Sequence, residues 1–166
     1  LEPRKNQLAI LKALQKGKFN NQVVFIGKQQ SYKNKLDQFI AENKLEKQVI
    51  FLHNLQEEEL AALYKMAACS VYISLFEGFG LPVIESMASG CPVITSNVSV
   101  LPETAGGAAL LCEPGDIDGL VENMKIFLED YRERIKWIEK GFERASLFNS
   151  KDFAVKMALL YNTIQI

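Results

Sequence analysis

Short apolar runs alternate with amphipathic segments along this chain, and this alternation is the feature that most restricts its fold. Helical spacing of apolar residues predicts one helix over 6–16 and another over about 31–43, with further helical segments between the later runs. The runs, rich in β-branched and aromatic residues, cover 23–26, 49–52, 71–74, 92–95 and 108–111. Strands and helices in alternation predict an α/β fold, a Rossmann-like doubly wound parallel sheet, in which ligands bind beyond the carboxyl ends of the strands.

Two parts of this pattern give more specific expectations. The run 23–26 is uniformly apolar and stops at Gly27, which is typical of a strand buried on both faces. Near the C-terminus, a proline and a glycine followed by Asp116 predict a turn and a helix N-cap, and two surface helices over 116–129 and about 131–147. We expect Trp137 to serve packing.

A final helix is expected over about 151–164, and it could pack on the sheet or reach towards another domain. The large apolar residues on its broad side are Phe153, Met157, Leu160, Tyr161 and Ile164.

Length and composition favour a single domain over residues 1–166, since 48% of the positions are hydrophobic and can form one core. The 19 basic and 20 acidic residues nearly cancel, which argues against nucleic acid as a partner. The three cysteines stand among small or apolar residues, which favours free core thiols and a cytoplasmic protein. Because a helix is expected within a few positions of Leu1, we also expect the chain to be part of a larger protein.

The segment from Glu77 to Glu85 contains the residues best suited to chemistry. Gly78 and Gly80 flank Phe79, and both glycines permit backbone conformations and close ligand approach that other residues hinder. A helix is expected to begin near the following proline, and its free N–H groups and dipole form an anion site without any metal. The segment therefore predicts a site for a diphosphate, with two separated carboxylates able to bind sugar hydroxyls.

This pattern, two glutamates eight positions apart around G-F-G-L-P, resembles the motif of the large GT-B family of retaining glycosyltransferases, known as family 4 or glycosyl transferases group 1. The resemblance covers about residues 1–130 and implies that the chain is the C-terminal, donor-binding half of such an enzyme. The other matching segments are 2–6, 49–52, the Glu-Glu-Leu turn, 85–94 and 113–116.

The resemblance also implies a role for each site residue. Glu85 would bind the ribose hydroxyls and Glu77 the donor-sugar hydroxyls, while Lys5, helped by Arg4, would neutralise the diphosphate. The backbone N–H groups of Phe79, Gly80 and Leu81 would contact the sugar and the distal phosphate. The loop at Leu52 and His53 would approach the base. Catalysis would depend on Glu77 and Lys5, with no metal and no cofactor.

By the same resemblance, a hexose passes from a nucleoside-diphosphate sugar to a glycan or lipid-linked acceptor, as in polysaccharide biosynthesis. The acceptor would be held by an N-terminal domain that this chain lacks, so the isolated chain is expected to have little or no activity. The setting would be the cytoplasm, with peripheral association of the full-length protein at the inner face of the membrane as a further option.

Other functions remain open at this stage. A sugar-nucleotide epimerase could use a similar diphosphate site, and a non-catalytic module could bind nucleotide-sugar without turnover. A nicotinamide-binding domain is excluded, because the first apolar run is followed by lysine and glutamines rather than by G-x-G-x-x-G. Lys5 and Arg4 could also be an ordinary solvated helix start, and a lone histidine such as His53 is often structural.

Overall fold

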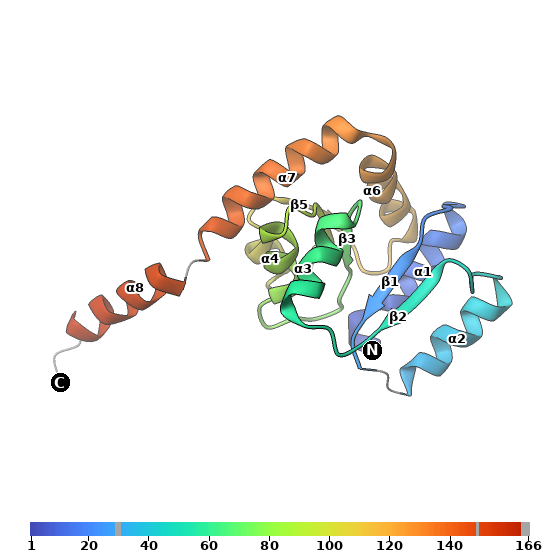
Figure 1. Ribbon diagram of the computed structural model, residues 1–166, viewed down its shortest axis with the longest axis horizontal. Helices are drawn as coiled ribbons and strands as arrows, with labels where there is room; N and C mark the ends of the chain where they lie inside the picture. The colour runs from blue at the N-terminus through green and yellow to red at the C-terminus, as the bar shows by residue number, and fades with distance from the viewer. Residues whose placement is uncertain (29–30, 149, 164–166) are drawn as a thin grey trace.

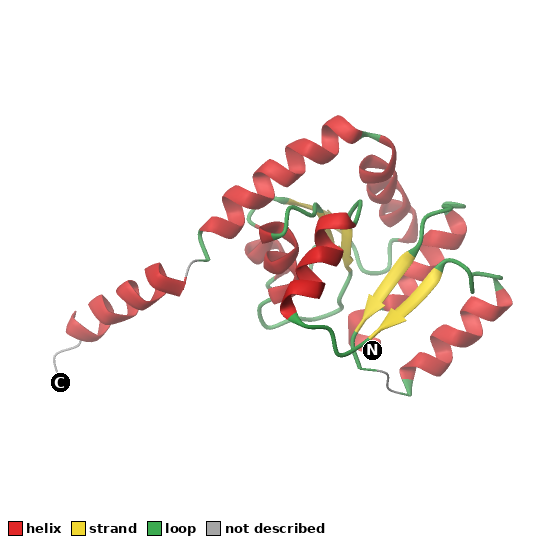
Figure 2. Cartoon of the chain, viewed as in Figure 1, coloured by secondary structure: helices red, strands yellow, loops and turns green. Residues whose placement is uncertain are grey.

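All strand pairs in the computed structural model, which describes residues 1–28, 31–148 and 150–163, are parallel. β1 (Val23–Ile26) pairs with β2 (Val49–Leu52), in register from Val23 opposite Val49 to Ile26 opposite Leu52. β4 (Val93–Ser96) lies between β3 (Ser70–Tyr72) and β5 (Ala109–Cys112). Strands and helices alternate as predicted (Figure 2), which confirms the α/β fold class.

The helices surround these strands, with bounds close to those predicted (Figure 1). In chain order they are α1 (Gln7–Lys16), α2 (Tyr32–Glu42), α3 (Glu57–Met66), α4 (Leu81–Ala88), α5 (Leu101–Ala105), α6 (Ile117–Glu129), α7 (Tyr131–Ser146) and α8 (Ser150–Thr163). A short 3-10 turn, η1 (Pro3–Lys5), precedes α1. Asn6 separates the two elements and has a left-handed backbone conformation, with φ of 54°.

The strands form two separate ladders within the described residues, and the N-terminal segment bridges them at their carboxyl ends. The amino group of Leu1 donates to the carbonyl of Lys28, just beyond β1, at 2.5 Å. The N–H of Leu75, just beyond β3, donates to the carbonyl of Arg4 at 2.8 Å. The carboxyl ends of β1 and β3 therefore lie at one edge of the molecule, where α/β folds bind ligands.

The prediction that the first strand is buried on both faces is wrong. Val24 and Ile26 are each 38% exposed, whereas Phe25 between them is buried. Phe25 stacks on Phe51 of β2, with ring centroids 5.6 Å apart, and joins the main core cluster together with residues of α1. Because successive side chains of a strand point to opposite faces, only the face that includes Phe25 packs against the core.

α6 is an amphipathic surface helix, as predicted: one of its sides belongs to the main core, and Asp118, Glu122 and Glu129 are exposed. The N-cap prediction is confirmed, since the side chain of Asp116 accepts a hydrogen bond from the N–H of Gly119 at 2.9 Å. Trp137 of α7 packs edge-on against Phe127 of α6, with centroids 6.3 Å apart, and so has the packing role expected of it. The buried residues of α6 are Leu120, Val121, Met124 and Phe127.

α8 confirms the predicted last helix and extends away from the sheets (Figure 1). Of the residues predicted on its apolar side, Phe153 is described only in its backbone and Ile164 lies outside the described residues. The apolar side chains of this helix that the structure describes as exposed are Val155, Leu159, Leu160 and Tyr161.

The three cysteines are free thiols, as expected. Burial raises the pKa of the Cys69 thiol to about 12 and the pKa values of Cys91 and Cys112 to about 11. These thiols are therefore protonated at neutral pH and unreactive. Separately, none of the helices in the described ranges has the length and apolar character that crossing a bilayer requires.

α4 is held between a second core cluster and α7. Val83 and Met87 of α4 are buried, and Gly141 of α7 packs against Met87. A Cβ atom at Gly141 would lie 3.3 Å from Met87 Cγ, so α7 approaches α4 closely because position 141 is glycine. The helix begins after Gly80, which has φ of 91°.

We predict that Gly80→Ala destabilises the fold whereas Gly78→Ala does not. At Gly80 a side chain would adopt a strained positive φ, and its Cβ would lie 2.6 Å from Leu101 Cδ2. At Gly78 a Cβ would meet nothing within 4 Å. Chemical denaturation should give a loss of about 1–3 kcal/mol in the free energy of unfolding for Gly80→Ala and under about 0.5 kcal/mol for Gly78→Ala. Equal losses in the two variants would contradict this interpretation.

Candidate functional site

The loop that joins β3 to α4 lies at the ligand-binding edge of the fold and contains the predicted motif. The two flanking elements fix its ends, since β3 pairs with β4 and α4 packs in the second core cluster. η1 lies against the same loop, because Arg4 Nη1 donates to the carbonyl of Phe76 at 2.7 Å. Residues from the chain start and from the motif thus meet at one place.

Glu77, itself buried, is the centre of a charge cluster whose cations, Arg4 and Lys5, are partly exposed. Its carboxylate Oε1 accepts hydrogen bonds from Lys5 Nζ at 2.6 Å and from the Tyr72 hydroxyl at 2.7 Å. The same oxygen forms an ion pair with Arg4 Nη1 at 2.7 Å. Lys5 also donates to the Tyr72 hydroxyl and lies 4.7 Å from the centroid of its ring. The structure therefore brings Lys5, Arg4 and Glu77 together, as the sequence had indicated.

The cluster keeps Glu77 ionised. Burial raises the pKa of this carboxyl, but hydrogen bonds with Lys5, Tyr72, Arg4 and Ser74 together outweigh it and lower the pKa to about 2. Among the described residues, no group donates to the second carboxylate oxygen, Oε2, with full hydrogen-bond geometry. Glu77 is thus a fixed negative charge whose Oε1 oxygen is committed to the cluster.

Tyr72 is a site residue that the sequence analysis missed. It was interpreted only as part of an apolar strand. Tyr72 and the fully buried Ser74 share one face of the chain at the carboxyl end of β3, because side chains alternate along an extended segment. Two hydroxyl side chains on one face, shortly before a glutamate, were the available signal.

The loop between Glu77 and α4 presents free backbone donors. In the part of the chain that the structure describes, the N–H groups of Gly78, Phe79, Gly80 and Leu81 donate no hydrogen bond. The start of α4 adds a partial positive charge at the same place. Of the two glycines expected to adopt a backbone conformation that other residues disfavour, only Gly80 does so, since the φ of Gly78 is not positive. Space around Gly78 is open, so its small size leaves room for a ligand.

Glu85 lies in the second turn of α4 and is exposed. Pro82, expected at the first helical position, is the second residue of α4, a shift of one residue that such boundaries commonly show. α3 packs on α4. Burial, with a smaller contribution from the charge of Glu85, raises the pKa of the Tyr64 phenol on α3. Tyr64 is a second neighbour of the site that sequence patterns did not indicate.

Leu52 and His53 stand at the carboxyl end of β2. Leu52 is half-buried and its carbonyl accepts a hydrogen bond from the N–H of Gly27 at 3.0 Å, whereas His53 is exposed. β2 is adjacent to β1, so these residues lie at the same edge as the Glu77 cluster. No described contact joins them to the motif, and their role at the base stays a prediction.

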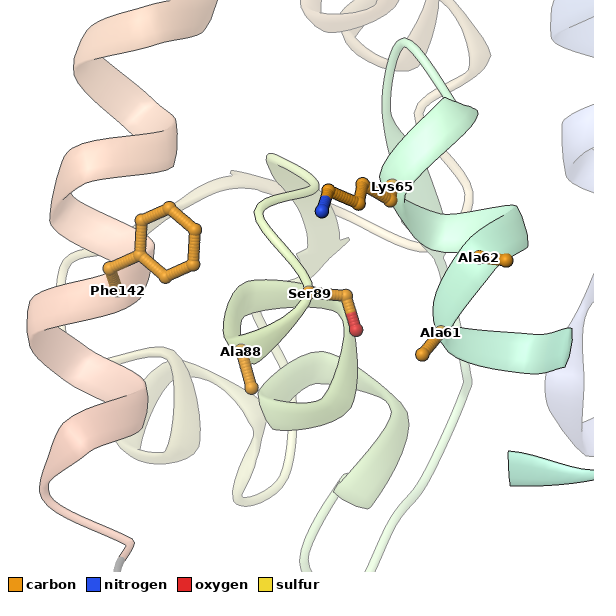
Figure 3. A pocket seen from close by; sticks show the side chains of 6 residues that line it. All are labelled: Ala61, Ala62, Lys65, Ala88, Ser89 and Phe142. Atoms are coloured by element: carbon orange, nitrogen blue, oxygen red, sulfur yellow. The ribbon is translucent and has the colours of Figure 1, made fainter. Parts of the chain in front are cut away.

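A separate pocket of about 350 Å³ lies at the C-terminal end of α4, between α3 and α7 (Figure 3). It contains none of the predicted site residues and no carboxylate. Its lining residues are Ala61, Ala62, Lys65, Ala88, Ser89 and Phe142. In addition, the described residues include no group of three or more His, Cys, Asp or Glu that could hold a metal ion.

The chain matches the family model described as glycosyl transferases group 1 over residues 1–144. It is 33% identical over 153 residues to the O-antigen chain mannosyltransferase B of Escherichia coli, an alignment that covers 90% of this chain and 40% of that protein. The chain therefore spans less than half the length of this curated relative.

Solved structures agree with this match. Sucrose-phosphate synthase from Thermosynechococcus elongatus, at 28% identity, superposes with a TM-score of 0.88 over 98% of this chain and 43% of that one. The C-terminal domain of a glycosyl transferase group 1 family protein from Francisella tularensis, at 25% identity, superposes with a TM-score of 0.78 over 89% of this chain and 80% of that one.

The parallel α/β fold, the motif loop at its carboxyl edge and these similarities agree with one another. The chain belongs to the glycosyl transferases group 1 family of GT-B glycosyltransferases.

Proposed function

We propose that this chain is the donor-binding half of a retaining glycosyltransferase that moves a hexose from a nucleoside-diphosphate sugar to a glycan or lipid-linked acceptor. The observation that carries the proposal is the set of free N–H groups of residues 78–81, which open α4 beside the cations of η1. Free N–H groups and a helix N-terminus favour a phosphate group. The relative from Escherichia coli is a mannosyltransferase, so mannose is the first hexose to test.

In this proposal Lys5 and Arg4 stabilise the diphosphate as it leaves the sugar. Both are held at the motif loop by the Oε1 atom of Glu77, at 2.6 and 2.7 Å. Their position is therefore set before any ligand arrives, which lowers the cost of binding and of stabilising developing charge. Cations and N–H groups together supply the positive charge that a metal ion provides in other phosphate sites, so no metal or other cofactor is required.

Glu77 would bind the donor sugar through Oε2, the oxygen that accepts no hydrogen bond of full geometry from the described residues. An ionised carboxylate only accepts hydrogen bonds, so it suits a sugar hydroxyl. Glu85, exposed in the second turn of α4, would accept the ribose hydroxyls in the same way. The loop at Leu52 and His53 would then face the base.

The acceptor would be held outside residues 1–166. Transfer by this chain alone should consequently be slow or absent, whereas donor binding should persist. We further propose that the full-length protein works in the cytoplasm in polysaccharide assembly, where lipid-linked acceptors would bring it to the inner face of the membrane.

We predict that the chain binds nucleoside diphosphates and that Glu85→Gln weakens this binding by about tenfold or more, because the ribose loses a charged hydrogen-bond acceptor. Isothermal titration calorimetry with UDP, GDP and ADP, and with their hexose derivatives, measures the affinities. Glu139→Gln is the matched control, since Glu139 is an exposed glutamate on α7.

Two results would argue against this site. If wild type binds none of these ligands, the proposed function is wrong. If Glu85→Gln binds them as wild type does, the ribose assignment fails. Consumption of a nucleotide-sugar without any acceptor, with its hexose epimerised, would instead support an epimerase.

We also predict that the Glu77 cluster stabilises the fold above pH 4.5 and loses this effect as the pH falls towards 2. The folded-state pKa is lowered from 4.5 to about 2, so acid protonates the carboxyl more readily in the unfolded chain. Between these pH values the free energy of unfolding should fall by about 2–3 kcal/mol more in wild type than in Glu77→Gln. Denaturant titrations across this range test it. Glu2→Gln, which removes an exposed partner of Arg4, should retain the wild-type slope.

A further inference from the structure

We propose that Ser99 and Thr104 are positioning residues that aim the N–H groups of Gly78 and Gly80 at the bound donor. This inference rests on the proposed donor site and concerns how its backbone donors come to face the ligand. Neither residue belongs to the motif, and both lie on the segment that follows β4.

Both residues hold carbonyl groups of the motif loop. The Ser99 hydroxyl donates to the carbonyl of Glu77 at 2.7 Å. The Thr104 hydroxyl, on a residue that is 3% exposed, donates to the carbonyl of Phe79. Ser99 also has φ of 58°, a strained conformation for a residue other than glycine, and strain of this kind collects at functional sites.

Because the peptide unit is planar, these hydrogen bonds also fix the direction of the N–H groups of Gly78 and Gly80. The carbonyl of Glu77 and the N–H of Gly78 belong to one peptide plane, and in a trans peptide they point in opposite directions. The described residues contain no cis peptide bond. Holding the Glu77 carbonyl towards Ser99 therefore turns the N–H of Gly78 away from Ser99. Thr104 does the same for the N–H of Gly80.

α7 fixes Thr104 in turn. Arg144 donates to the carbonyl of Glu103 at 2.6 Å and to the carbonyl of Thr104 at 3.0 Å, at the C-terminal end of α5. A Cβ atom at Gly106 would lie 2.4 Å from Arg144 Nε, so the arginine reaches these carbonyls because position 106 is glycine. The position of Thr104 is thus set by tertiary packing and not by the loop it holds.

The chain offers a matched control for this interpretation. Thr95 of β4 is also fully buried and donates to a backbone carbonyl, that of Tyr72, at 2.9 Å. Thr95→Val and Thr104→Val each remove a buried hydroxyl that donates to a backbone carbonyl. Only Thr104→Val releases a carbonyl of the motif loop, so a general loss of stability and a loss of donor orientation can be separated.

The first readout is ligand selectivity, measured by NMR titration with UDP and GDP and with uridine and guanosine. Thr104→Val should weaken nucleoside diphosphate binding about tenfold, the worth of one hydrogen bond to a charged group, and leave nucleoside binding unchanged. Ser99→Ala should act in the same direction, Thr104→Ser should restore affinity, and Thr95→Val should alter neither ligand class. Wild-type affinity for the diphosphates in Thr104→Val would overturn the inference.

The second readout needs no ligand. Loss of the hydrogen bond to the Phe79 carbonyl should shift the amide nitrogen resonance of Gly80 in Thr104→Val but not in Thr95→Val. An unmoved Gly80 resonance would overturn the inference even if donor binding were intact. If wild type binds no nucleotide, the proposed function falls, whereas a shifted Gly80 still supports the orientation of the loop by Thr104.

Discussion

The charge cluster at Glu77 is the interaction on which the arrangement of the site depends. It joins η1 to the motif loop across 72 positions of sequence, through Lys5 and Glu77. A buried carboxylate without partners would be costly, and so would a lysine turned away from water. The ion pair between Lys5 and Glu77 offsets the desolvation cost of both groups. It also holds the N-terminal segment against the ends of β1 and β3. Fold and site are therefore stabilised by the same few contacts.

Much of the fold could be predicted from local patterns. Periodicity identified the strands and the main helices, because the spacing of apolar residues within a run such as 49–52 or a stretch such as 6–16 depends on the local secondary structure. It did not show how strands pair across the molecule. The uniform apolar run 23–26 indicated two buried faces, yet Val24 and Ile26 are partly exposed, since burial depends on elements that are distant in sequence. α6 was easier, because the period of its apolar residues marks the one side that packs on the core.

The site shows the same division between local and distant information. The spacing of Glu77, the glycines and Glu85 lies within one short segment, so the loop and the start of α4 could be recognised together. Tyr72 was missed because a tyrosine in a strand is ordinarily a packing residue, and only the fold shows that its hydroxyl meets Lys5 and Glu77. Ser99 and Thr104 carry no recognisable spacing relative to the motif, and their contacts exist only in three dimensions.

The packing of α7 on α4 has a consequence for how the domain folds. Gly141 is the buried residue of α7, and a glycine inside a helix costs about 1 kcal/mol relative to alanine. α7 is therefore stabilised by its tertiary contacts, with Met87 of α4 and with Phe127 of α6. The other end of α4 presents the N–H groups of the motif. Since each helix completes the surface that the other packs on, the two should form cooperatively. Local unfolding that releases α7 would then disrupt the proposed donor site as well, and a ligand bound at the motif loop would protect α7 from unfolding.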